Sequence, residues 1–327
     1  MRNTLNEQPD AAGHTASALD TERPKILVVS AIGDRRRASL AARYDLTFDR
    51  EDRIGVRAVL LDGALRLDAA ALATFPDLGL IACIGAGFDR VDIDACRARG
   101  VKVSNTAGAN ADAVADFAIG MMLSLTRRIG EGEAALRAGD WRGHNVKRFF
   151  SAPGLTGRRV GIVGMGSIGR QLTQRLAGFE VEIAYTGPQP KPNVPYTYVA
   201  SIRELATWAD ILVLAHRADE TSRGLVDAPV LDALGPDGHL INVSRGSAVN
   251  EDALIAALFA GTLGGAALDV FDTEPRVRSD LIAAPNTVLT PHIAGGSRRA
   301  FDRMVDRARA NLDAHFDGRP LPNPVLA

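Results

Sequence analysis

The chain has 327 residues, enough for two domains with separate hydrophobic cores, and 46% of them are apolar. No apolar run approaches the ~18 residues of a membrane span, and 38 basic residues nearly balance 39 acidic ones, which argues against a membrane protein and against a nucleic-acid partner. Two cysteines make no disulfide framework, and no Cys/His cluster has metal-ligand spacing, so we expect no metal site.

The N-terminal segment is polar and lacks the apolar stretch of a signal peptide. We interpret residues 1–23 as a disordered tail that precedes the first domain. The absence of a targeting signature in this segment leads us to expect a cytoplasmic protein.

Short apolar runs, each ended by a turn-prone segment, follow the tail. They lie at residues 24–30, 56–61, 78–84 and 101–104. Such runs are typical of parallel strands that are buried on both faces. Helical stretches alternate with them, and this alternation indicates βαβ units in a doubly wound sheet.

A largely apolar helical pattern then runs from Ala111 to about Ala138. A helix that is apolar on so many sides needs either a second domain or a second subunit to cover it. The segment that follows, residues 140–156 with Trp141 near its start, is predicted to be irregular.

A second alternating series begins at Arg159. Its strands are predicted at residues 159–164, 181–186, 211–216, 239–244, 265–271 and 286–290. One helix follows the first strand, and the others are predicted to begin near Ser201, Asp227, Asn250 and Ser297. The last helix, at residues 297–316, comes after the second sheet is complete, and we expect it to return to the first domain. This predicts a discontinuous domain of residues 24–125 and 297–327 around a domain of residues 126–296.

A GxGxxG pattern of Gly164, Gly166 and Gly169 lies between the first strand and helix of this second series, as in a dinucleotide-binding fingerprint. Gly164 would permit the tight turn, Gly166 would let the backbone approach a pyrophosphate, and Gly169 would allow close packing of helix on strand. The amides of Ser167 and Ile168 would face the phosphates. A plain structural turn is the less favoured alternative.

The end of the next strand bears on the choice of cofactor. An NAD-binding unit usually carries an acid about twenty residues after the glycines, where it binds the ribose hydroxyls. This chain has Tyr185-Thr186-Gly187 there, so no carboxylate repels a 2′-phosphate and the Thr186 hydroxyl can bond to it. We therefore predict NADP(H) as the favoured cofactor and NAD(H) as the alternative, with Lys191 the basic residue nearby.

One further strand end adds candidates on the same rim of the sheet. We place His216, at the end of the strand predicted at 211–216, among the cofactor contacts. Arg217 directly after it is either another cofactor contact or a solvated loop residue.

Three polar residues follow late strands of the second sheet. They are Arg245 in Asn-Val-Ser-Arg-Gly, Glu274 in Asp-Val-Phe-Asp-Thr-Glu-Pro and His292 in Thr-Pro-His-Ile-Ala-Gly. All three are predicted at the carboxyl edge of the sheet, where such folds bind ligands. Together they suit the reduction of a 2-keto acid: His292 would supply the proton, Glu274 would keep it protonated, and Arg245 would bind the carboxylate and keto oxygen. Each residue also has a structural interpretation, as a structural histidine, a loop acid and a capping or surface arginine.

From Lys25 to its C-terminus the chain resembles the D-isomer-specific 2-hydroxyacid dehydrogenase family. The resemblance is carried by residues 85–92 (Gly-Ala-Gly-Phe-Asp-Arg-Val-Asp), Asn105-Thr106, Val114-Ala115-Asp116, the glycine-rich loop and the three motifs above. It implies an α/β protein of two doubly wound parallel-sheet domains, a flavodoxin-like substrate domain and a Rossmann cofactor domain. The active site would lie in the cleft between them.

The resemblance also implies further contacts. Those to the cofactor fall on Thr106, Val243, Asp269 (for the nicotinamide carboxamide) and Gly295 after Ala294. Those to the substrate carboxylate fall on the amides of Ile84, Gly85, Ala86 and Gly87, beside Arg245.

The resemblance bears on assembly as well. Dimers of this family form largely through the cofactor domains, so we expect a homodimer. The second subunit would then cover the long apolar helix. Trp141 sits where a tryptophan can reach the substrate pocket of the neighbouring subunit. A core or ordinary interface tryptophan is the alternative.

Within the family, Thr186 and the segment Val194-Pro195-Tyr196 resemble NADPH-preferring glyoxylate, hydroxypyruvate and hydroxyphenylpyruvate reductases. We therefore predict reduction of a small 2-keto acid, glyoxylate, hydroxypyruvate or an aryl pyruvate, to the D-2-hydroxy acid. The alternatives are an NAD-preferring dehydrogenase that works in the oxidative direction and an NAD(H)-sensing, corepressor-like binding protein. Formate-type members carry glutamine at the position of Glu274, so this acid argues against their chemistry.

Overall fold

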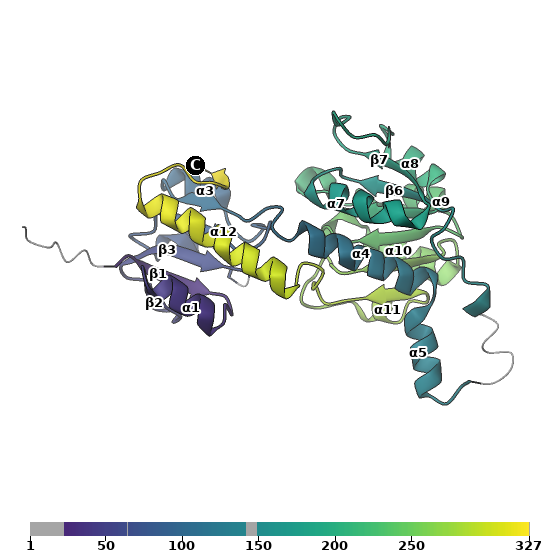
Figure 1. Ribbon diagram of the computed structural model, residues 1–327, viewed down its shortest axis with the longest axis horizontal. Helices are drawn as coiled ribbons and strands as arrows, with labels where there is room; N and C mark the ends of the chain where they lie inside the picture. The colour runs from purple at the N-terminus through teal and green to yellow at the C-terminus, as the bar shows by residue number, and fades with distance from the viewer. Residues whose placement is uncertain (1–22, 64, 142–148, 327) are drawn as a thin grey trace, which may run out of the picture.

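The computed structural model describes residues 23–63, 65–141 and 149–326, so residues 1–22 of the predicted tail lie outside it. Two α/β domains lie along the long axis of the molecule, as Figure 1 shows. Within the described part of the chain, no helix has the length and apolarity to span a membrane. The predicted fold class of two parallel-sheet domains is confirmed.

The first domain is built on a six-stranded sheet in the order β13-β5-β4-β3-β1-β2. Its strands are β1 (Lys25–Val29), β2 (Asp45–Thr47), β3 (Val56–Leu61), β4 (Leu80–Cys83), β5 (Lys102–Ser104) and β13 (Pro324–Leu326). All neighbours pair in parallel except β13, which runs antiparallel to β5. The order of β1 to β5 is the flavodoxin-like one. The edge strands β2 and β13 were not predicted, because neither contains a buried residue and so neither belongs to the apolar runs that mark buried strands.

Helices cover both faces of this sheet. They are α1 (Asp34–Ala41), α2 (Ala69–Ala73), α3 (Ile93–Ala98) and α12 (Arg298–Phe316). The first and last pack on one face, where Leu40 and Leu312 join a buried cluster with Ile26 of β1. The middle two pack on the other face, around Leu72 and Cys96. The segment after residue 297 therefore lies on the first sheet.

The second domain is built on seven parallel strands in the order β12-β11-β10-β9-β6-β7-β8. They are β6 (Arg159–Val163), β7 (Glu182–Thr186), β8 (Thr197–Tyr198), β9 (Ile211–Leu214), β10 (His239–Asn242), β11 (Gly265–Leu268) and β12 (Thr287–Leu289). Counted from β6, this is the Rossmann order with a seventh strand added. The direction of winding reverses between β6 and β9, and ligands bind such sheets at the carboxyl ends of the strands beside that point.

The helices of the second domain form two layers. They are α4 (Ala111–Thr126), α5 (Ile129–Arg137), α7 (Ser167–Leu176), α8 (Ile202–Trp208), α9 (Ala228–Leu234), α10 (Glu251–Ala260) and α11 (Ser279–Ile282). The predicted helix starts are confirmed. The side chains of Ser201, Asp227, Asn250 and Ser297 each accept a hydrogen bond from the backbone N–H three residues on, as N-cap residues do.

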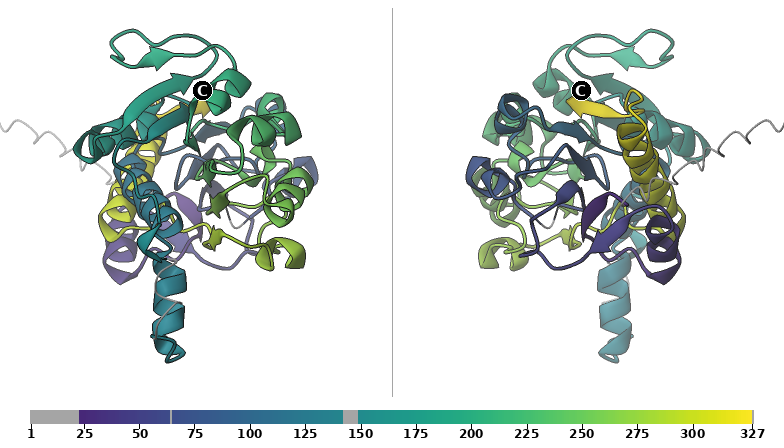
Figure 2. Two further views of the ribbon diagram at one scale, coloured as in Figure 1. Left: turned by 90° about the vertical axis from the view of Figure 1, so that its right-hand side faces the viewer. Right: turned by 90° about the vertical axis from the view of Figure 1, so that its left-hand side faces the viewer.

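The long helix predicted over residues 111–138 is two helices. Arg128 adopts a left-handed backbone conformation (φ 53°), which ends α4 and lets α5 leave in a new direction. The first of the two buries Val114, Ala118 and Met122 in the core of the second domain, against Leu172 of α7. The predicted domain boundary between residues 125 and 126 is therefore one helix too late. None of the nine residues of α5 is buried, and this helix stands away from the body of the molecule (Figure 2).

Candidate active site

The glycine-rich loop lies at the switch point, between β6 and α7. Gly164 has φ 98°, and a Cβ there would lie 2.4 Å from the Cα of His216. A Cβ at Gly169 would lie 2.3 Å from the carbonyl oxygen of Gly164. A Cβ at Gly166, by contrast, would meet no atom within 4 Å. The packing of the protein explains Gly164 and Gly169. Gly166 leaves open space of the kind that a pyrophosphate needs.

The start of α7 carries the predicted phosphate contacts. Gly166 is its N-cap, and no side chain among the described residues caps the first turn. The amides of Ser167 and Ile168 therefore belong to the set that a helix cannot satisfy internally, and the helix dipole favours an anion there. These residues fit the phosphates of a dinucleotide.

The end of β7 lacks an acid, and the segment after it is held by two tyrosines. The Tyr185 hydroxyl accepts a hydrogen bond from the Lys191 amide (2.8 Å), and the Tyr198 hydroxyl donates to the Gly187 carbonyl (3.0 Å). The two rings pack edge to face with centroids 5.5 Å apart. Thr186 is the last residue of β7 and is buried. It lies at the strand end where a ribose would bind.

Arg245 follows β10 on a turn that is tightly fixed. The Asn242 side chain accepts a hydrogen bond from the Ser244 amide (3.0 Å) and donates one to the Arg245 carbonyl (2.8 Å). The Ser244 hydroxyl donates to the His216 carbonyl (2.7 Å), which ties this turn to the end of β9. A Cβ at Gly246 would lie 1.8 Å from the backbone carbon of Phe271, so only glycine fits there.

Glu274 and His292 meet directly beyond the ends of β11 and β12. His292 Nδ1 donates to Glu274 Oε2 (2.9 Å), and Glu274 Oε1 accepts from the Phe271 amide (3.0 Å). A carboxylate can only accept, so Nδ1 carries the proton and Nε2 remains for a ligand. The imidazole is 49% exposed and the carboxylate 30%, which leaves the pair accessible to a ligand from solvent.

The pair favours its charged form. The hydrogen bond to Glu274 raises the pKa of His292 above its ordinary value, against the opposing effects of burial and of the Arg245 cation. Burial is the largest influence on Glu274 and favours the neutral acid, but the hydrogen bonds from His292 and from the Phe271 amide together lower the pKa of Glu274. Each partner therefore stabilises the charged form of the other, so imidazolium and carboxylate are both favoured more than they would be if each group stood alone.

Asp269 lies at the end of β11 and is buried. Its Oδ1 accepts from the Thr290 hydroxyl (2.6 Å) and from the Ile293 amide (2.9 Å), and its Oδ2 accepts from the Ala294 amide (2.8 Å). Its carbonyl also accepts from the His292 amide (2.8 Å). The residue predicted to bind the carboxamide thus holds the loop that presents His292, and Oδ2 keeps room for one more donor.

The predicted substrate loop follows β4 in the first domain. The Ile84 amide already donates to Leu61 (2.7 Å), and the Gly85 amide donates to the Thr106 hydroxyl (2.7 Å). These two amides are therefore not available to an anion, contrary to the prediction. The amides of Ala86 and Gly87 donate to no acceptor among the described residues.

The remaining predicted cofactor contacts lie around the linkers between the domains. Thr106 precedes Gly108, where a Cβ would lie 3.6 Å from the Cβ of Ser167, so this linker crosses the start of α7. A Cβ at Gly295, in the linker that leads back to the first domain, would lie 2.5 Å from the side-chain nitrogen Nδ2 of Asn110. Val243 follows β10 directly and is buried.

His216 and Arg217 differ in their surroundings. His216 is half-buried, both of its ring nitrogens are buried without a partner among the described residues, and burial lowers its pKa, which favours the neutral ring. The guanidinium of Arg217 lies 4.5 Å from the centroid of the Phe88 ring, which belongs to the substrate loop. Arg217 is nonetheless exposed, so it remains a loop residue in contact with solvent.

One residue of this cleft was not predicted to have a role. Asp89 Oδ2 accepts a hydrogen bond from Arg245 Nε (3.0 Å) across the two domains. Asp89 lies in the Gly-Ala-Gly-Phe-Asp segment that carries the family resemblance, and that segment was the available signal. No feature of the sequence pairs it with an arginine 156 positions later.

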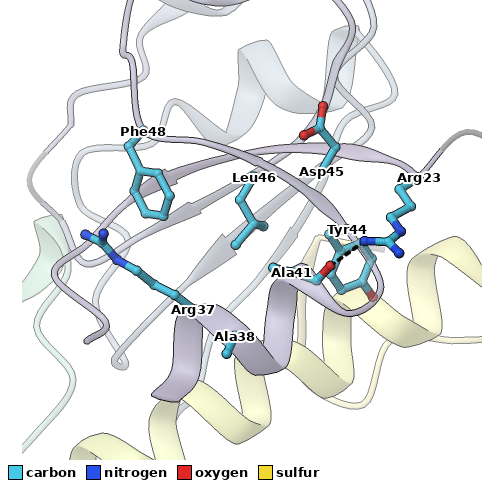
Figure 3. Close-up of a pocket in the computed structure, with 8 residues that line it drawn as sticks. All are labelled: Arg23, Arg37, Ala38, Ala41, Tyr44, Asp45, Leu46 and Phe48. Carbon is cyan, nitrogen blue, oxygen red and sulfur yellow. Dashed lines mark hydrogen bonds between the residues drawn. The ribbon is translucent and has the colours of Figure 1, made fainter. Parts of the chain in front are cut away.

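A cavity of about 690 Å³ lies elsewhere, at the outer edge of the first sheet (Figure 3). It is lined by Arg23, Arg37, Ala38, Ala41, Tyr44, Asp45, Leu46 and Phe48. Arg23 donates to the Ala41 carbonyl (2.8 Å), and Arg37 lies 4.2 Å from the centroid of the Phe48 ring. This cavity shares no residue with the cleft. Among the described residues, no group of three or more His, Cys, Asp or Glu side chains could hold a metal ion.

Comparison with known proteins gives consistent matches. A family model described as D-isomer specific 2-hydroxyacid dehydrogenase, NAD binding domain, matches residues 119–294. Hydroxyphenylpyruvate reductase of Plectranthus scutellarioides is 40% identical over 271 residues, which cover 83% of this chain and 86% of that protein. Glyoxylate/hydroxypyruvate reductase A of Arabidopsis thaliana is 39% identical over 274 residues, which cover 84% and 87%.

A solved structure is equally similar. The NADPH-dependent glyoxylate/hydroxypyruvate reductase of Sinorhizobium meliloti, in complex with NADP and malonate, superimposes with a TM-score of 0.83 at 36% identity. The match covers 93% of this chain and 97% of that one.

The pKa of His292 should depend on the charge of Glu274. We expect Glu274→Gln to lower this pKa, because the amide keeps the shape of the hydrogen bond but not the negative charge. An NMR titration of the imidazole signals measures the effect. Asp272→Asn is the matched control, since this neighbouring carboxylate pairs with Arg223. An unchanged His292 titration in Glu274→Gln would contradict the assignment of the pair.

Proposed function

The chain belongs to the D-isomer specific 2-hydroxyacid dehydrogenase family, and on that premise we propose that it reduces a small 2-keto acid to the D-2-hydroxy acid with NADPH. The observation that carries the proposal is the His292–Glu274 pair. The imidazole, bound to a carboxylate through Nδ1, follows β12 and so lies at the carboxyl edge of the same sheet that carries the glycine-rich loop after β6. This arrangement supplies a proton where a hydride can arrive.

Each polar group of the cleft has a step in this reaction. Arg245 binds the substrate carboxylate and polarises the keto oxygen, and the free amides of Ala86 and Gly87 complete the anion site. His292 Nε2 donates the proton to the keto oxygen, while Glu274 stabilises the imidazolium before the transfer. The nicotinamide, when bound, supplies the hydride to the carbonyl carbon. The open space beside Gly166 and the first turn of α7 fit its pyrophosphate.

The substrate class follows from the relatives. Proteins 40% and 39% identical to this chain are named hydroxyphenylpyruvate reductase and glyoxylate/hydroxypyruvate reductase. We propose glyoxylate, hydroxypyruvate or an aryl pyruvate as substrate. All three share the 2-keto carboxylate that Arg245 and the loop amides are placed to bind.

The preference for NADP(H) rests on the end of β7. Thr186 stands where an acid would repel a 2′-phosphate, and its hydroxyl can donate to one. The similar Sinorhizobium meliloti reductase is described as NADPH-dependent. NAD(H) is the alternative, because the residues directly after Thr186 include no arginine that could bind a 2′-phosphate. Lys191 is the nearest basic residue in the sequence.

The proposed homodimer rests on α5 and the segment after it. Ile129 and Leu136 are 56% and 58% exposed, and Trp141 and Phe150 are 73% and 84% exposed. Four exposed large apolar side chains, two of them on the projecting helix α5, favour a partner that covers them. Because Trp141 is no core residue of this protomer, we propose that it reaches the neighbouring subunit. The cytoplasmic location stays a prediction.

His292→Gln should abolish most of the activity. We expect a loss of about 10²–10⁴ in kcat for keto acid reduction, as removal of a general acid causes, while NADPH still binds. NADPH and NADH consumption is followed at the nicotinamide absorbance band with glyoxylate, hydroxypyruvate, phenylpyruvate and hydroxyphenylpyruvate. Reduction needs imidazolium, so the wild-type rate should hold below the folded pKa of His292 and fall as pH rises through it. Turnover by His292→Gln at the wild-type rate would exclude His292 as the general acid.

Thr186→Asp should shift the preference toward NADH. The new carboxylate repels a 2′-phosphate and can bind the ribose hydroxyls of NADH. The ratio of kcat/KM for NADPH to kcat/KM for NADH measures the shift. Thr197→Asp, which adds the same charge at an exposed position on the neighbouring strand, is the control. Equal ratios in wild type and Thr186→Asp would contradict the proposed role of Thr186 in the preference for NADPH.

The double variant Ile129→Glu, Leu136→Glu should separate the dimer. Two charges on the exposed apolar face of α5 cannot be buried without a large cost. Sedimentation is expected to give the mass of two chains for wild type and of one chain for the variant. Phe259→Glu, on α10, changes an apolar residue of the same exposure (57%) and should leave the mass unchanged. A dimeric double variant would exclude α5 as the interface.

A further inference from the structure

The substrate loop of the first domain contacts two arginines of the second domain through consecutive residues. Asp89 Oδ2 lies 3.0 Å from Arg245 Nε, and the Phe88 ring lies under the Arg217 guanidinium. The two arginines follow β9 and β10, which are neighbours in the second sheet. The contacts therefore join the loop after β4 to two adjacent strand ends across the cleft.

The Arg245 guanidinium is fixed at two of its three nitrogens. Nε donates to Asp89 in one domain, and Nη1 donates to the Ser244 carbonyl (2.8 Å) in its own. Two acceptors at different edges of a planar group determine the plane and its rotation. The third nitrogen, Nη2, is thereby directed to a defined place.

That place is the backbone of Gly87. A Cβ there would lie 2.3 Å from Arg245 Nη2, where it would displace the guanidinium, and 3.2 Å from Asp89 Oδ2, a tight contact that a small shift relieves. The Gly87 and Ala86 amides, which donate to no acceptor among the described residues, belong to the same turn. One cationic N–H group thus lies beside the turn that carries two free amides, and donors of this kind suit a carboxylate.

We propose that Asp89 is a positioning residue for substrate binding: it holds the Arg245 guanidinium across the cleft so that Nη2 and the Ala86 and Gly87 amides converge on the substrate carboxylate. The inference rests on the proposed function and adds a residue to it. Asp89 acts through Arg245 and does not touch the substrate itself. The Arg217–Phe88 contact keeps the same loop in register.

Asp89 is not a competitor for the substrate in this arrangement. Its carboxylate takes Nε and leaves both hydrogens of Nη2 free. Nor is the pair a device for folding stability, since Asp89 is 61% exposed and Arg245 32% exposed, and such pairs are screened by water and salt. Its consequence is orientation, and misplacement of a binding group impairs affinity and rate more than it impairs folding.

The test compares Asp89→Ala and Asp89→Asn with wild type. We expect Asp89→Ala to raise KM for the 2-keto acid by about tenfold to a hundredfold, with the Kd for NADPH and the Tm unchanged. Asp89→Asn should recover part of the loss, because its amide oxygen can still accept from Arg245 Nε. Asp94→Ala is the matched control, since this acid of the same domain pairs with Arg97 on one exposed helix.

A binding measurement separates this inference from the proposed function. Oxalate, an unreactive dicarboxylate, is titrated by calorimetry into the NADPH complex of each variant, which needs no turnover. Weaker oxalate binding by Asp89→Ala, with Asp89→Asn between it and wild type, supports the positioning role even if no keto acid of the panel is reduced. Equal or tighter binding by Asp89→Ala, or Asp89→Asn no better than Asp89→Ala, would overturn it.

Gly87→Ala provides a second route to the same guanidinium. The added methyl group displaces the flexible end of Arg245 and leaves Asp89 in place. We expect weaker oxalate binding with an unchanged Kd for NADPH. Oxalate affinity equal to that of wild type would contradict the convergence of Nη2 and the loop amides.

Discussion

The hydrogen bond between His292 and Glu274 is the interaction on which the rest of the cleft depends. It fixes the tautomer of the imidazole, raises the pKa of His292 and leaves Nε2 for a ligand. The bond forms only because the loops after β11 and β12 are tied together by the buried Asp269, which accepts from three donors of the His292 loop. A parallel sheet supplies the frame, since the carboxyl ends of its strands lie on one edge.

The two domains divide the work of the site. The cofactor elements, the glycine-rich loop and the end of β7, all belong to the second domain, as do Glu274 and His292. The proposed carboxylate site is shared, because Arg245 comes from the second domain and the free loop amides come from the first. In the proposed function, substrate binding therefore requires the domains to be close, whereas cofactor binding does not.

The glycines of this site are needed for two different physical reasons. Gly164, Gly169 and Gly246 are required by the packing of the protein, since a Cβ at each would meet backbone atoms at 2.4 Å or less. Gly166 faces open space, so its lack of a side chain serves a ligand. Gly87 lies between these cases, because the atoms in its way belong to the Arg245 and Asp89 side chains.

The sequence by itself determined the strands other than β2, β8 and β13, four helix starts and the three polar residues after β10, β11 and β12. Apolar runs, N-cap residues and short motifs are local patterns, and their physical causes act within a few residues. Tertiary structure decided what depends on distant contacts. Arg128 breaks the predicted helix and α4 packs on the second sheet, because its apolar face fits α7. The Gly85 amide is taken by Thr106, and Asp89 meets Arg245 across 156 positions, because folding brings two domains to one cleft.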